Sequence, residues 1–296
     1  MILVTGVTGF IGGHLLESLI KKYGKQNIVA LTSAPISKCD FLLHNDYNFD
    51  INYFVNSGFE NIEIIIHAGA FMPKSNADAN YINGCNSNII STTKLLSSIL
   101  PKLKKFIFFS TVDVYAHENP ITELTPISPA SLYGHSKVYC EQIITTWALH
   151  NNICHQILRI GHVYGEGEEK FKKIIPVTMQ RLLSNIPLQM NGDGIEIRSF
   201  IYVQDAVNAI LNALKIKNEA GIINLVGHEK ISMKDLLNEI IAVSRKSPKI
   251  NLMKKTTPNR DLIFDNSKMR DLLYIPKVGL KEGLLKEWNY MKKLSK

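Results

Sequence analysis

The sequence predicts an α/β fold, in which a doubly wound parallel sheet is followed by a smaller C-terminal α/β unit. Three observations predict it: short apolar runs alternate with helical patterns, a glycine turn joins the first run to the first helix, and the alternation loosens after residue 165. The chain has 296 residues, of which 45% are hydrophobic and 20% charged, as is usual for folded proteins. This length suits one large domain or two unequal ones and excludes a minimal binding module.

The predicted strands and helices follow one another as repeated β-α units. Apolar runs of the kind buried on both faces of a parallel sheet predict strands at residues 2–5, 28–31, 62–66, 105–109 and 157–160. Helical patterns include residues 15–20, where Gly24 ends the helix, and cover residues 82–100, 132–150, 233–244 and 281–293. Strands that alternate with helices pair in parallel. Residues 1–165, with roughly 200–226, are therefore expected to form the sheet domain, and residues 166–199 and 227–296 the smaller one.

The positive charge of the chain is concentrated near its C-terminus. The net charge is +8, and residues 245–296 hold fourteen basic against five acidic residues. This excess fits either a solvated helix face or a surface that meets an anionic, phosphorylated ligand. No basic run carries interleaved aromatic residues, so no nucleic-acid partner is expected.

Cysteines, histidines and hydropathy predict a cytoplasmic protein without a metal. The four cysteines form no CxxC pair, which indicates buried, reduced thiols rather than disulfides or a zinc site. The nine histidines include no HExxH pattern, so no metal is expected. The chain starts without a basic and apolar leader and has no run of about 18 apolar residues, so neither secretion nor membrane binding is expected.

A glycine turn lies between the first predicted strand and the first helix. Residues 5–12, TGVTGFIG, place three glycines at intervals of three residues. Such a turn lets the backbone approach a pyrophosphate, which then lies on N–H groups at the positive end of the helix. The strand, the helix and the N-terminal position together predict a Rossmann domain that binds NAD(P), so the smaller domain is expected to bind the substrate. The expected cofactor contacts here are Gly6, Gly9, Phe10, Ile11 and Gly12.

The residues after the second strand bear on the choice of cofactor. An acidic residue about 20 positions beyond the glycines would bind the ribose 2′-hydroxyl of NAD. Residues 30–33 read ALTS, without an acid, and Thr32, Ser33 or Lys38 can instead serve a 2′-phosphate. The sequence therefore favours NADP(H) over NAD(H), although no arginine is present to bind the phosphate.

Tyr133 and Lys137 begin the helix predicted at residues 132–150. Their i, i+4 spacing puts both side chains on one helix face, one turn apart. A phenol is a weak acid or base at neutral pH, but a neighbouring ammonium and a cationic nicotinamide both favour the phenolate. Ser110 and Thr111, which follow the strand at residues 105–109, add hydroxyl groups.

Together these elements resemble the extended short-chain dehydrogenase/reductase family, in particular its NAD-dependent nucleotide-sugar epimerases, dehydratases and reductases. The resemblance covers nearly the whole chain. It implies that Thr111 hydrogen-bonds the reacting oxygen and that Tyr133 transfers the proton. It also implies that Lys137 holds the nicotinamide ribose and lowers the pKa of the tyrosine. These three residues form the expected catalytic set.

Other segments resemble the family's cofactor-binding motifs. Residues 50–51 look like the Asp-Ile/Leu pair that contacts adenine, residues 67–70 (HAGA) look like the HLAA loop beneath the cofactor, and residues 88–92 (NIIST) look like NVxGT. His67 itself is expected to be structural. The implied cofactor contacts, beyond those of the glycine turn, Thr32, Ser33 and the catalytic tyrosine and lysine, are Asp50, Ile51, Ala68, Gly69, Ala70, Asn88, Ile160, His162 and Val163.

Two further segments resemble the family's substrate-binding motifs. Residues 159–165 (RIGHVYG) match RxxNVYG, except that His162 stands where Asn is usual. Residues 198–205 (RSFIYVQD) resemble RDFVHVDD, in which the arginine binds the nucleotide diphosphate, and Arg260 resembles a second phosphate-binding arginine. The implied partner is a nucleotide-diphosphate sugar, contacted by Thr111, Asp113, His162, Arg198 and Arg260. Asp113 also fits a solvated residue, and His162 a hydrogen-bonded pocket histidine.

The resemblance implies hydride transfer at C4 of the sugar, which serves three different reactions in this family. A 4,6-dehydratase carries Thr-Asp-Glu after this strand, but residues 111–113 read TVD, and Val112 cannot donate a proton. A 4-epimerase of the UDP-glucose type keeps NAD bound and returns the hydride to the other face, whereas a reductase uses NADPH once. The missing acid and the short chain favour a 4-keto-6-deoxyhexose reductase over the epimerase.

The resemblance also implies that the protein is catalytic, and it implies a cellular setting. Non-catalytic, NAD(P)-sensing proteins of this fold usually lack the tyrosine or the lysine, and both are present here. A cytoplasmic homodimer that acts in the biosynthesis of cell-surface polysaccharide is the expected setting.

Overall fold

A computed structural model describes residues 1–295 except 76, 117, 218–219 and 255–259. The chain divides into two compact units. Unit 1 comprises Met1–Ala116, Ile127–Ile160 and Val207–Ile223, and unit 2 comprises His117–Pro126, Gly161–Ala206 and Asn224–Lys296. Which unit binds which ligand stays a prediction.

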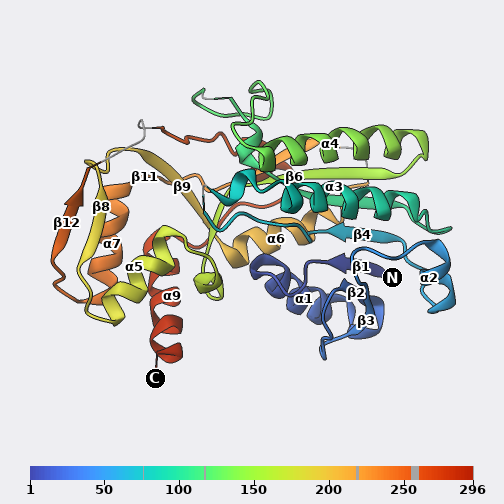
Figure 1. The fold of residues 1–296 in the computed structure, drawn as a ribbon, viewed down its shortest axis with the longest axis horizontal. Helices are drawn as coiled ribbons and strands as arrows, with labels where there is room; N and C mark the ends of the chain where they lie inside the picture. Colours follow the sequence, from blue (N-terminus) through green and yellow to red (C-terminus); the bar gives the residue numbers. More distant parts are fainter. Residues whose placement is uncertain (76, 117, 218–219, 255–259, 296) are drawn as a thin grey trace. The chain divides into compact units, whose positions relative to one another are not determined.

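A seven-stranded sheet forms the centre of unit 1, in the order β10-β6-β5-β4-β1-β2-β3 (Figure 1). The six strands from β6 to β3 pair in parallel. Strand order reverses direction at β1, which confirms the predicted doubly wound Rossmann fold. The strands are β1 (Ile2–Thr5), β2 (Ile28–Thr32), β3 (Asp40–Leu43), β4 (Ile64–His67), β5 (Lys105–Thr111), β6 (Cys154–Ile160) and β10 (Ile222–Leu225), whose last two residues belong to unit 2.

Helices cover both faces of this sheet. Right-handed crossovers on either side of β1 place α1 on one face and α3 and α4 on the other (Figure 1). The core beneath α3 and α4 includes Leu95, Phe106 and Ile144, each at most 2% exposed. The helices are α1 (Phe10–Tyr23), α2 (Ile51–Asn56), α3 (Ile82–Ser97), α4 (Leu132–His150) and α6 (Val203–Ala213), with 3₁₀ turns at Lys25–Asn27, Asp78–Asn80 and Val112–Val114.

All five apolar runs form strands, with ends that differ from the prediction. β4 starts at residue 64 because the preceding Ile62, although fully buried, bonds its N–H to the Phe59 carbonyl in a turn. β6 starts at Cys154 because its register with β5 continues to the pair Lys105 and Cys154. The helix predicted to reach residue 100 ends at Ser97. β3 and α2 are absent from the predicted elements because their sequences carry no strong apolar period.

Unit 2 holds two small sheets and a group of packed helices. One sheet has the order β11-β9-β7, and the other pairs β12 with β8. α5, α7 and α9 pack against one another. The elements are β7 (His162–Tyr164), a 3₁₀ turn (Glu168–Lys170), α5 (Ile174–Leu183), β8 (Leu188–Asn191), β9 (Ile197–Tyr202), β11 (Lys230–Ser232), α7 (Met233–Ser244), β12 (Ile250–Met253), α8 (Ser267–Leu272) and α9 (Leu280–Leu294). No helix among the described residues is both long and apolar enough to cross a membrane.

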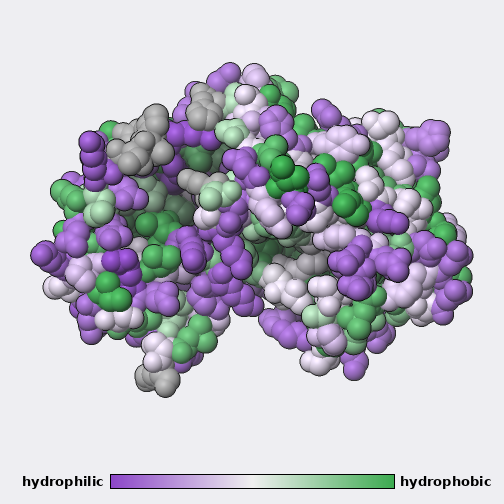
Figure 2. Space-filling view, in the orientation of Figure 1, coloured by the Kyte–Doolittle hydropathy of each residue, from purple (hydrophilic) through white to green (hydrophobic). Residues whose placement is uncertain are grey.

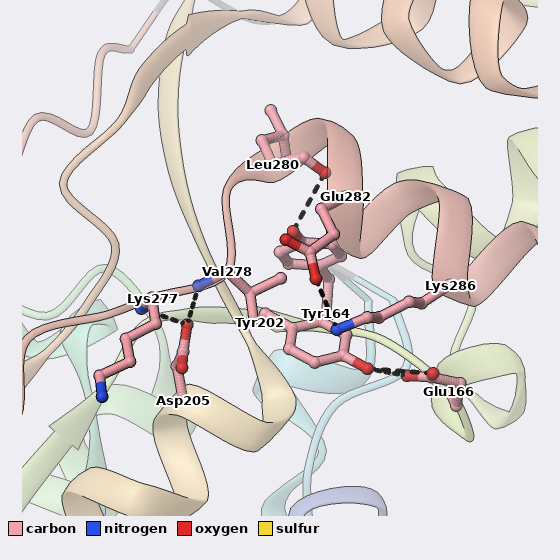
Figure 3. A network of polar contacts seen from close by, with 9 residues as sticks. All are labelled: Tyr164, Glu166, Tyr202, Asp205, Lys277, Val278, Leu280, Glu282 and Lys286. Carbon is pink, nitrogen blue, oxygen red and sulfur yellow. Dashed lines mark hydrogen bonds and ion pairs between the residues drawn. The ribbon is translucent and has the colours of Figure 1, made fainter.

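Polar contacts fasten the segment before α9 and the start of α9 to the rest of unit 2 (Figure 3). The buried Asp205 carboxylate accepts from the backbone N–H groups of Lys277 and Val278, at 3.0 and 2.8 Å. Tyr164 donates to the Leu280 carbonyl at 3.2 Å, so α9 begins directly over β7. The C-terminal helix is therefore part of the core of unit 2.

Glu287 is a buried acid in this core. It is 0% exposed, and neither of its carboxyl oxygens has a hydrogen-bond partner among the described residues. Burial, together with the nearby carboxylates of Glu168, Glu166 and Glu169, raises its pKa to about 9. Glu287 is therefore neutral at pH 7 in the folded protein.

Glu287→Gln is expected to stabilise the protein increasingly as the pH rises. Between the ordinary pKa of 4.5 and the folded value of about 9, only the folded state keeps the proton, so native stability falls across this window. The loss is at most about 1.4 kcal/mol per pH unit. Glutamine stays neutral. The midpoint of thermal unfolding of the Glu287→Gln variant should therefore exceed that of the wild type by a margin that grows from pH 5 to pH 9.

The control for this comparison is Glu282→Gln, on the exposed side of α9. Glu282 is 58% exposed and pairs with Lys286, so its removal should give no margin that grows with pH. A margin for Glu287→Gln that stays constant with pH would show that Glu287 is ionised in the folded protein.

Candidate active site

The glycine turn forms a tight loop between β1 and α1. Gly6 has a φ of +73°, which favours glycine, and its carbonyl accepts from the Gly9 N–H at 3.0 Å. Gly9 is the N-cap of α1 and supplies no side-chain cap, and no acidic residue lies in the first turn, where Phe10 and Ile11 start the helix. The N–H groups and positive dipole of this helix end are therefore suited to an anion.

Close backbone approach explains why this loop needs glycine. A Cβ on Gly12 would lie 2.0 Å from the Gly6 carbonyl oxygen, and a Cβ on Gly6 would lie 2.6 Å from the Gly69 nitrogen. A Cβ on Gly9 would lie 3.2 Å from the Gly6 oxygen and otherwise meet open space. Gly6 and Gly12 thus pack the turn against its neighbours, while the space above Gly9 is open to a ligand.

The loop after β4, residues 67–70, lies directly beside the glycine turn. The Gly69 N–H donates to Thr5 Oγ1 at 2.7 Å, and the threonine hydroxyl donates to His67 Nδ1 at 2.8 Å, because the other ring nitrogen of His67 is the one that carries the proton. His67 Nε2 then donates to Thr92 Oγ1 at 3.1 Å, and Thr92 donates to the Asn88 carbonyl at 2.7 Å. Burial lowers the pKa of His67 to about 3, in keeping with this neutral tautomer. His67 is structural, and it holds Ala68, Gly69 and Ala70 next to Gly6.

Asn88 connects this loop with α4. Its side chain accepts from the Phe71 N–H at 2.7 Å and donates to the Phe71 carbonyl at 3.2 Å. The amide also donates to Ser136 Oγ, at 3.4 Å, and Ser136 donates to the Tyr133 carbonyl at 2.8 Å. Asn88 therefore ties the loop after β4 to α4, and direct contact of its side chain with a cofactor stays a prediction.

Thr32, Ser33, Asp50 and Ile51 lie at the ends of other elements of unit 1. Thr32 ends β2, is 5% exposed, and its hydroxyl exchanges hydrogen bonds with the backbone of Ala34. Ser33 is exposed. Asp50 is the N-cap of α2, which begins at Ile51, and its carboxylate accepts from the Tyr53 N–H at 2.9 Å. Asp50 thus has a local capping role that the sequence did not reveal.

Thr111, Tyr133 and Lys137 come together at the C-terminal end of β5. All three are buried, at 6%, 8% and 3% exposure. The Thr111 hydroxyl lies close enough to the Tyr133 phenol to lower its pKa, and Lys137 Nζ donates to the Phe109 carbonyl of the same strand at 2.8 Å. Ser131 caps α4 by accepting from the Gly134 N–H at 3.2 Å, which fixes the first helical turn with Tyr133.

Burial sets the protonation of this set in the protein without cofactor. Burial, assisted by Asp113, raises the pKa of Tyr133, although the Thr111 hydroxyl lowers it. Burial also lowers the pKa of Lys137 to about 8. Lys137 donates to a backbone carbonyl, and its charge does not offset the burial of the phenol. Without a further positive charge beside it, Tyr133 is therefore a neutral phenol.

Val112 and Asp113 follow Thr111 in a 3₁₀ turn. Val112 is 5% exposed and offers no proton, whereas Asp113 is exposed and donates its backbone N–H to Thr111 Oγ1 at 3.2 Å. No group of three or more His, Cys, Asp or Glu side chains within the described ranges is arranged to hold a metal ion.

Unit 2 brings the predicted substrate residues His162, Arg198 and Arg260 together, while Val163 is buried in β7. Arg198 Nη1 donates to the Ile197 carbonyl at 2.8 Å and to the Arg260 carbonyl. Burial and the charges of Lys173, Arg198 and Arg260 lower the pKa of His162 to about 3. A neutral imidazole therefore lies in a positive field that favours an anionic ligand. Lys173 is the N-cap of α5 and lies in no motif, so the sequence did not indicate it as a site residue.

Comparisons with known proteins agree with this arrangement. The sequence model of the NAD dependent epimerase/dehydratase family matches residues 2–227. The chain belongs to this family. Its members among the relatives below are enzymes that act on nucleotide sugars, which confirms the resemblance inferred from the motifs and the prediction of an enzyme.

Similar proteins include both epimerases and dehydratases. A putative UDP-glucose 4-epimerase from Methanocaldococcus jannaschii is 29% identical, with 99% of this chain and 98% of that protein covered. A human dTDP-D-glucose 4,6-dehydratase is 27% identical, with 97% and 89% covered. The crystal structure of a Bacillus cereus UDP-glucuronic acid 4-epimerase with UDP-glucuronic acid and NAD has a TM-score of 0.86 at 28% identity, with 99% of each chain covered.

The residues of the glycine turn fit the NAD of this family. A pyrophosphate needs open space at the turn and free N–H groups at the helix end, and the space over Gly9 and the uncapped first turn of α1 provide both. A cofactor placed there lies beside Gly69, which packs against Gly6 in the same unit.

Proposed function

We propose that this protein is a nucleotide-sugar 4-epimerase that retains NAD and acts on UDP-sugars. The observation that carries the proposal is the buried set of Thr111, Tyr133 and Lys137, in which Tyr133 is the proton-transferring group, while the neighbouring Asp113 is exposed. The epimerases among its relatives support this reading. Burial of Val112 at the position where a dehydratase carries its acid argues against dehydration.

In the proposed reaction, Tyr133 takes the proton of the C4 hydroxyl and later returns it. A bound NAD would supply a hydride acceptor and donor for C4, and its positive nicotinamide would favour the Tyr133 phenolate. Thr111 holds the reacting oxygen, and Lys137 holds the nicotinamide ribose. Because the proton returns to the C4 oxygen and the hydride returns to the opposite face of C4, the product differs from the substrate only in configuration at C4.

The experiment is a product analysis with the purified protein. The denatured protein should release NAD, and incubation with UDP-glucose or UDP-glucuronic acid should yield the C4 epimer by ¹H NMR without added cofactor. Stoichiometric oxidation of NADPH by a 4-keto-6-deoxy sugar nucleotide, with no retained NAD, would instead establish the reductase.

The reductase stays the second candidate because the end of β2 carries no acid. The structure leaves few donors for the 2′-phosphate of NADPH, however. The Thr32 hydroxyl is used in its own turn, and Lys38 pairs with Glu17, which leaves the exposed Ser33. We therefore propose NAD(H) as the cofactor.

Ser33→Asp is expected to increase the preference for NADH. The new carboxylate would repel a 2′-phosphate and accept from a 2′-hydroxyl, so the ratio of NADH to NADPH affinity should rise about tenfold or more. Fluorescence titration of the cofactor-free protein with each reduced cofactor measures this ratio. Lys25→Asp, on the exposed turn before β2, is the control for charge alone; an equal rise in both variants would place the ribose elsewhere.

Arg198→Ala is expected to raise KM far more than it lowers kcat. If the guanidinium binds a diphosphate away from C4, it contributes equally to ground and transition states, and its loss should cost about tenfold or more in KM. Steady-state kinetics with a UDP-sugar measures both constants, and Arg270→Ala, an exposed arginine in α8, is the control. A collapse of kcat at constant KM would assign Arg198 to the chemistry.

We also propose that two copies pair through α3 and α4. Ile82, Ile90, Tyr139 and Leu149 on these helices are 61%, 47%, 47% and 62% exposed, and Figure 2 shows apolar residues among polar ones over this region. The buried Trp147 indole N–H has no partner among the described residues. Light scattering after size exclusion should give the mass of a dimer, and Ile90→Glu with Tyr139→Glu that of a monomer; a monomeric wild type would refute the pairing.

A further inference from the structure

Glu141 is a buried acid of α4 for which the proposed reaction has no use. Tyr133, Lys137 and Glu141 follow one another at intervals of four residues, so their side chains share one helix face. Glu141 lies eight residues after Tyr133, or about 12 Å along the axis. It is 5% exposed, and a carboxylate at this depth requires strong partners.

Two neighbouring strands supply these partners. Arg159 donates to both carboxylate oxygens, with Nε to Oε1 at 3.0 Å and Nη2 to Oε2 at 2.6 Å. Ser110 donates its hydroxyl to Oε1. Ser110 and Arg159 lie directly opposite each other in the register of β5 and β6. We call these three residues the Glu141 clamp; it connects one helix with two strands.

The strand residues of the clamp lie next to the ends of their strands. Ser110 precedes Thr111, the last residue of β5, and Arg159 precedes Ile160, the last residue of β6. Lys137 forms a second contact between the same helix and β5 through the Phe109 carbonyl. The helix that carries Tyr133 is thus fastened to the strand that carries Thr111 within one residue of that threonine.

Arg159 is itself held in a fixed place. It is 2% exposed, and its guanidinium carbon lies 4.6 Å from the centroid of the Tyr115 ring. A planar guanidinium that grips both oxygens of a carboxylate fixes direction as well as distance, which a lysine cannot do. The clamp therefore defines the rotation and the height of α4 above the sheet.

The carboxylate also acts on Lys137, one turn away. Cys140 and the negative charge of Glu141 both raise the pKa of Lys137, against the larger lowering by burial, and the buried His67 also faces this lysine. Loss of the Glu141 charge would favour a neutral lysine at a lower pH. The clamp can thus be tested through the ionisation of Lys137 as well as through geometry.

We propose that Glu141 is a positioning residue, which through Ser110 and Arg159 sets the helix bearing Tyr133 and Lys137 against the strand end bearing Thr111. The inference rests on the proposed function in that Thr111, Tyr133 and Lys137 are the reacting set. A buried ion pair contributes little net stability over an apolar pair of similar size, so stability alone gives little reason for the clamp. Misplacement of reacting groups by about 1 Å, by contrast, can cost about a hundredfold in rate.

The test compares three variants with the wild type. Glu141→Gln removes the charge, Arg159→Lys keeps the charge but loses the two-pronged grip, and the double change Glu141→Leu with Arg159→Met replaces the pair with apolar side chains of similar size. The double variant guards against misfolding, since an apolar pair avoids an unpaired buried charge. Retained NAD and an unchanged circular dichroism spectrum would show that each variant is folded.

We expect kcat to fall by about ten- to a hundredfold in the double variant, while KM for the UDP-sugar changes less than threefold. The kcat of Arg159→Lys should lie between that of the double variant and that of the wild type, and its pH profile should be that of the wild type. Glu141→Gln should move the alkaline limb of the profile, which lies near pH 8 if Lys137 must be charged, to lower pH. A double variant with kcat within threefold of the wild type, or an unmoved limb in Glu141→Gln, would overturn the inference.

A second measurement separates this inference from the proposed reaction. If Lys137 holds the nicotinamide ribose, the affinity for NADH should weaken as the lysine loses its proton, and fluorescence titration across pH 6–10 follows this without turnover. The weakening should begin at lower pH in Glu141→Gln than in the wild type, and identical curves would count against the clamp. A wild type that epimerises no UDP-sugar but shows this shift would refute the proposed function alone.

Discussion

Tyr133→Phe is expected to reduce kcat by about 10² to 10⁴ while the protein keeps its NAD, the usual range for loss of a general acid–base group. The change removes one oxygen, which lies beside the Thr111 hydroxyl. The Tyr133 carbonyl, which accepts from Ser136, is untouched, so α4 should keep its place. Epimer formation per hour at saturating UDP-sugar, measured by ¹H NMR, gives the ratio.

The matched control is Tyr139→Phe, on the same helix. Tyr139 is 47% exposed and faces away from the reacting set, so its variant should keep the wild-type kcat. If Tyr133→Phe retained activity within threefold of the wild type, a group other than this phenol would carry the proton.

Burial adds a second expectation for this tyrosine. Because the pKa of Tyr133 is raised and that of Lys137 lowered, the free protein holds a neutral phenol. The phenolate then has to be favoured by a charge that arrives with the cofactor. The sequence showed that the lysine is one turn away, but the depth of both side chains, and so the sign of each shift, needed the packed structure.

The sequence predicted the parts of the fold that have strong local signals. α4 and α7 begin and end where the pattern placed them, and Ser131 and Ser232 fix their starts by capping their N-termini. The edge strand β3 and the short α2 lack such a period, and Asp50, which resembles an adenine contact, also caps α2. A local capping signal and a binding motif can thus share one residue, and the sequence indicated only the binding role of Asp50.

Other parts of the site depend on pairing between distant segments. The Glu141 clamp exists because β5 and β6 align Ser110 with Arg159, and a register cannot be obtained from the residues of either strand alone. The same holds for the approach of Gly69 to Gly6, which the match of residues 67–70 to a loop motif suggested without showing the contact. Sequence patterns identified these residues, and the structure supplied their partners.

Gly12→Ala is expected to abolish NAD binding and to lower the midpoint of thermal unfolding. The new Cβ would lie 2.0 Å from the Gly6 carbonyl oxygen and 2.7 Å from its carbon, and both are backbone atoms that cannot rotate away. The first turn of α1 would have to move from β1, at a cost of about 1–3 kcal/mol or more, and the N–H groups at the helix end would move with it. NAD content after denaturation and a thermal melt measure the two effects.

Gly9→Ala and Gly13→Ala separate packing from binding in the same turn. Gly9 has an ordinary φ of −78°, and its Cβ would lie 3.2 Å from one carbonyl oxygen, so the fold should persist while NADH affinity falls about tenfold or more, because a pyrophosphate needs that space. Gly13 would place its Cβ at an ordinary 3.6 Å from the Val7 oxygen, so alanine there should leave binding unchanged and stabilise α1 by about 0.4–1 kcal/mol. If Gly9→Ala bound NADH as the wild type does, the cofactor would not approach the backbone at this turn. If Gly12→Ala melted with the wild type and kept its NAD, the close packing of α1 on β1 would not be what holds the binding loop in place.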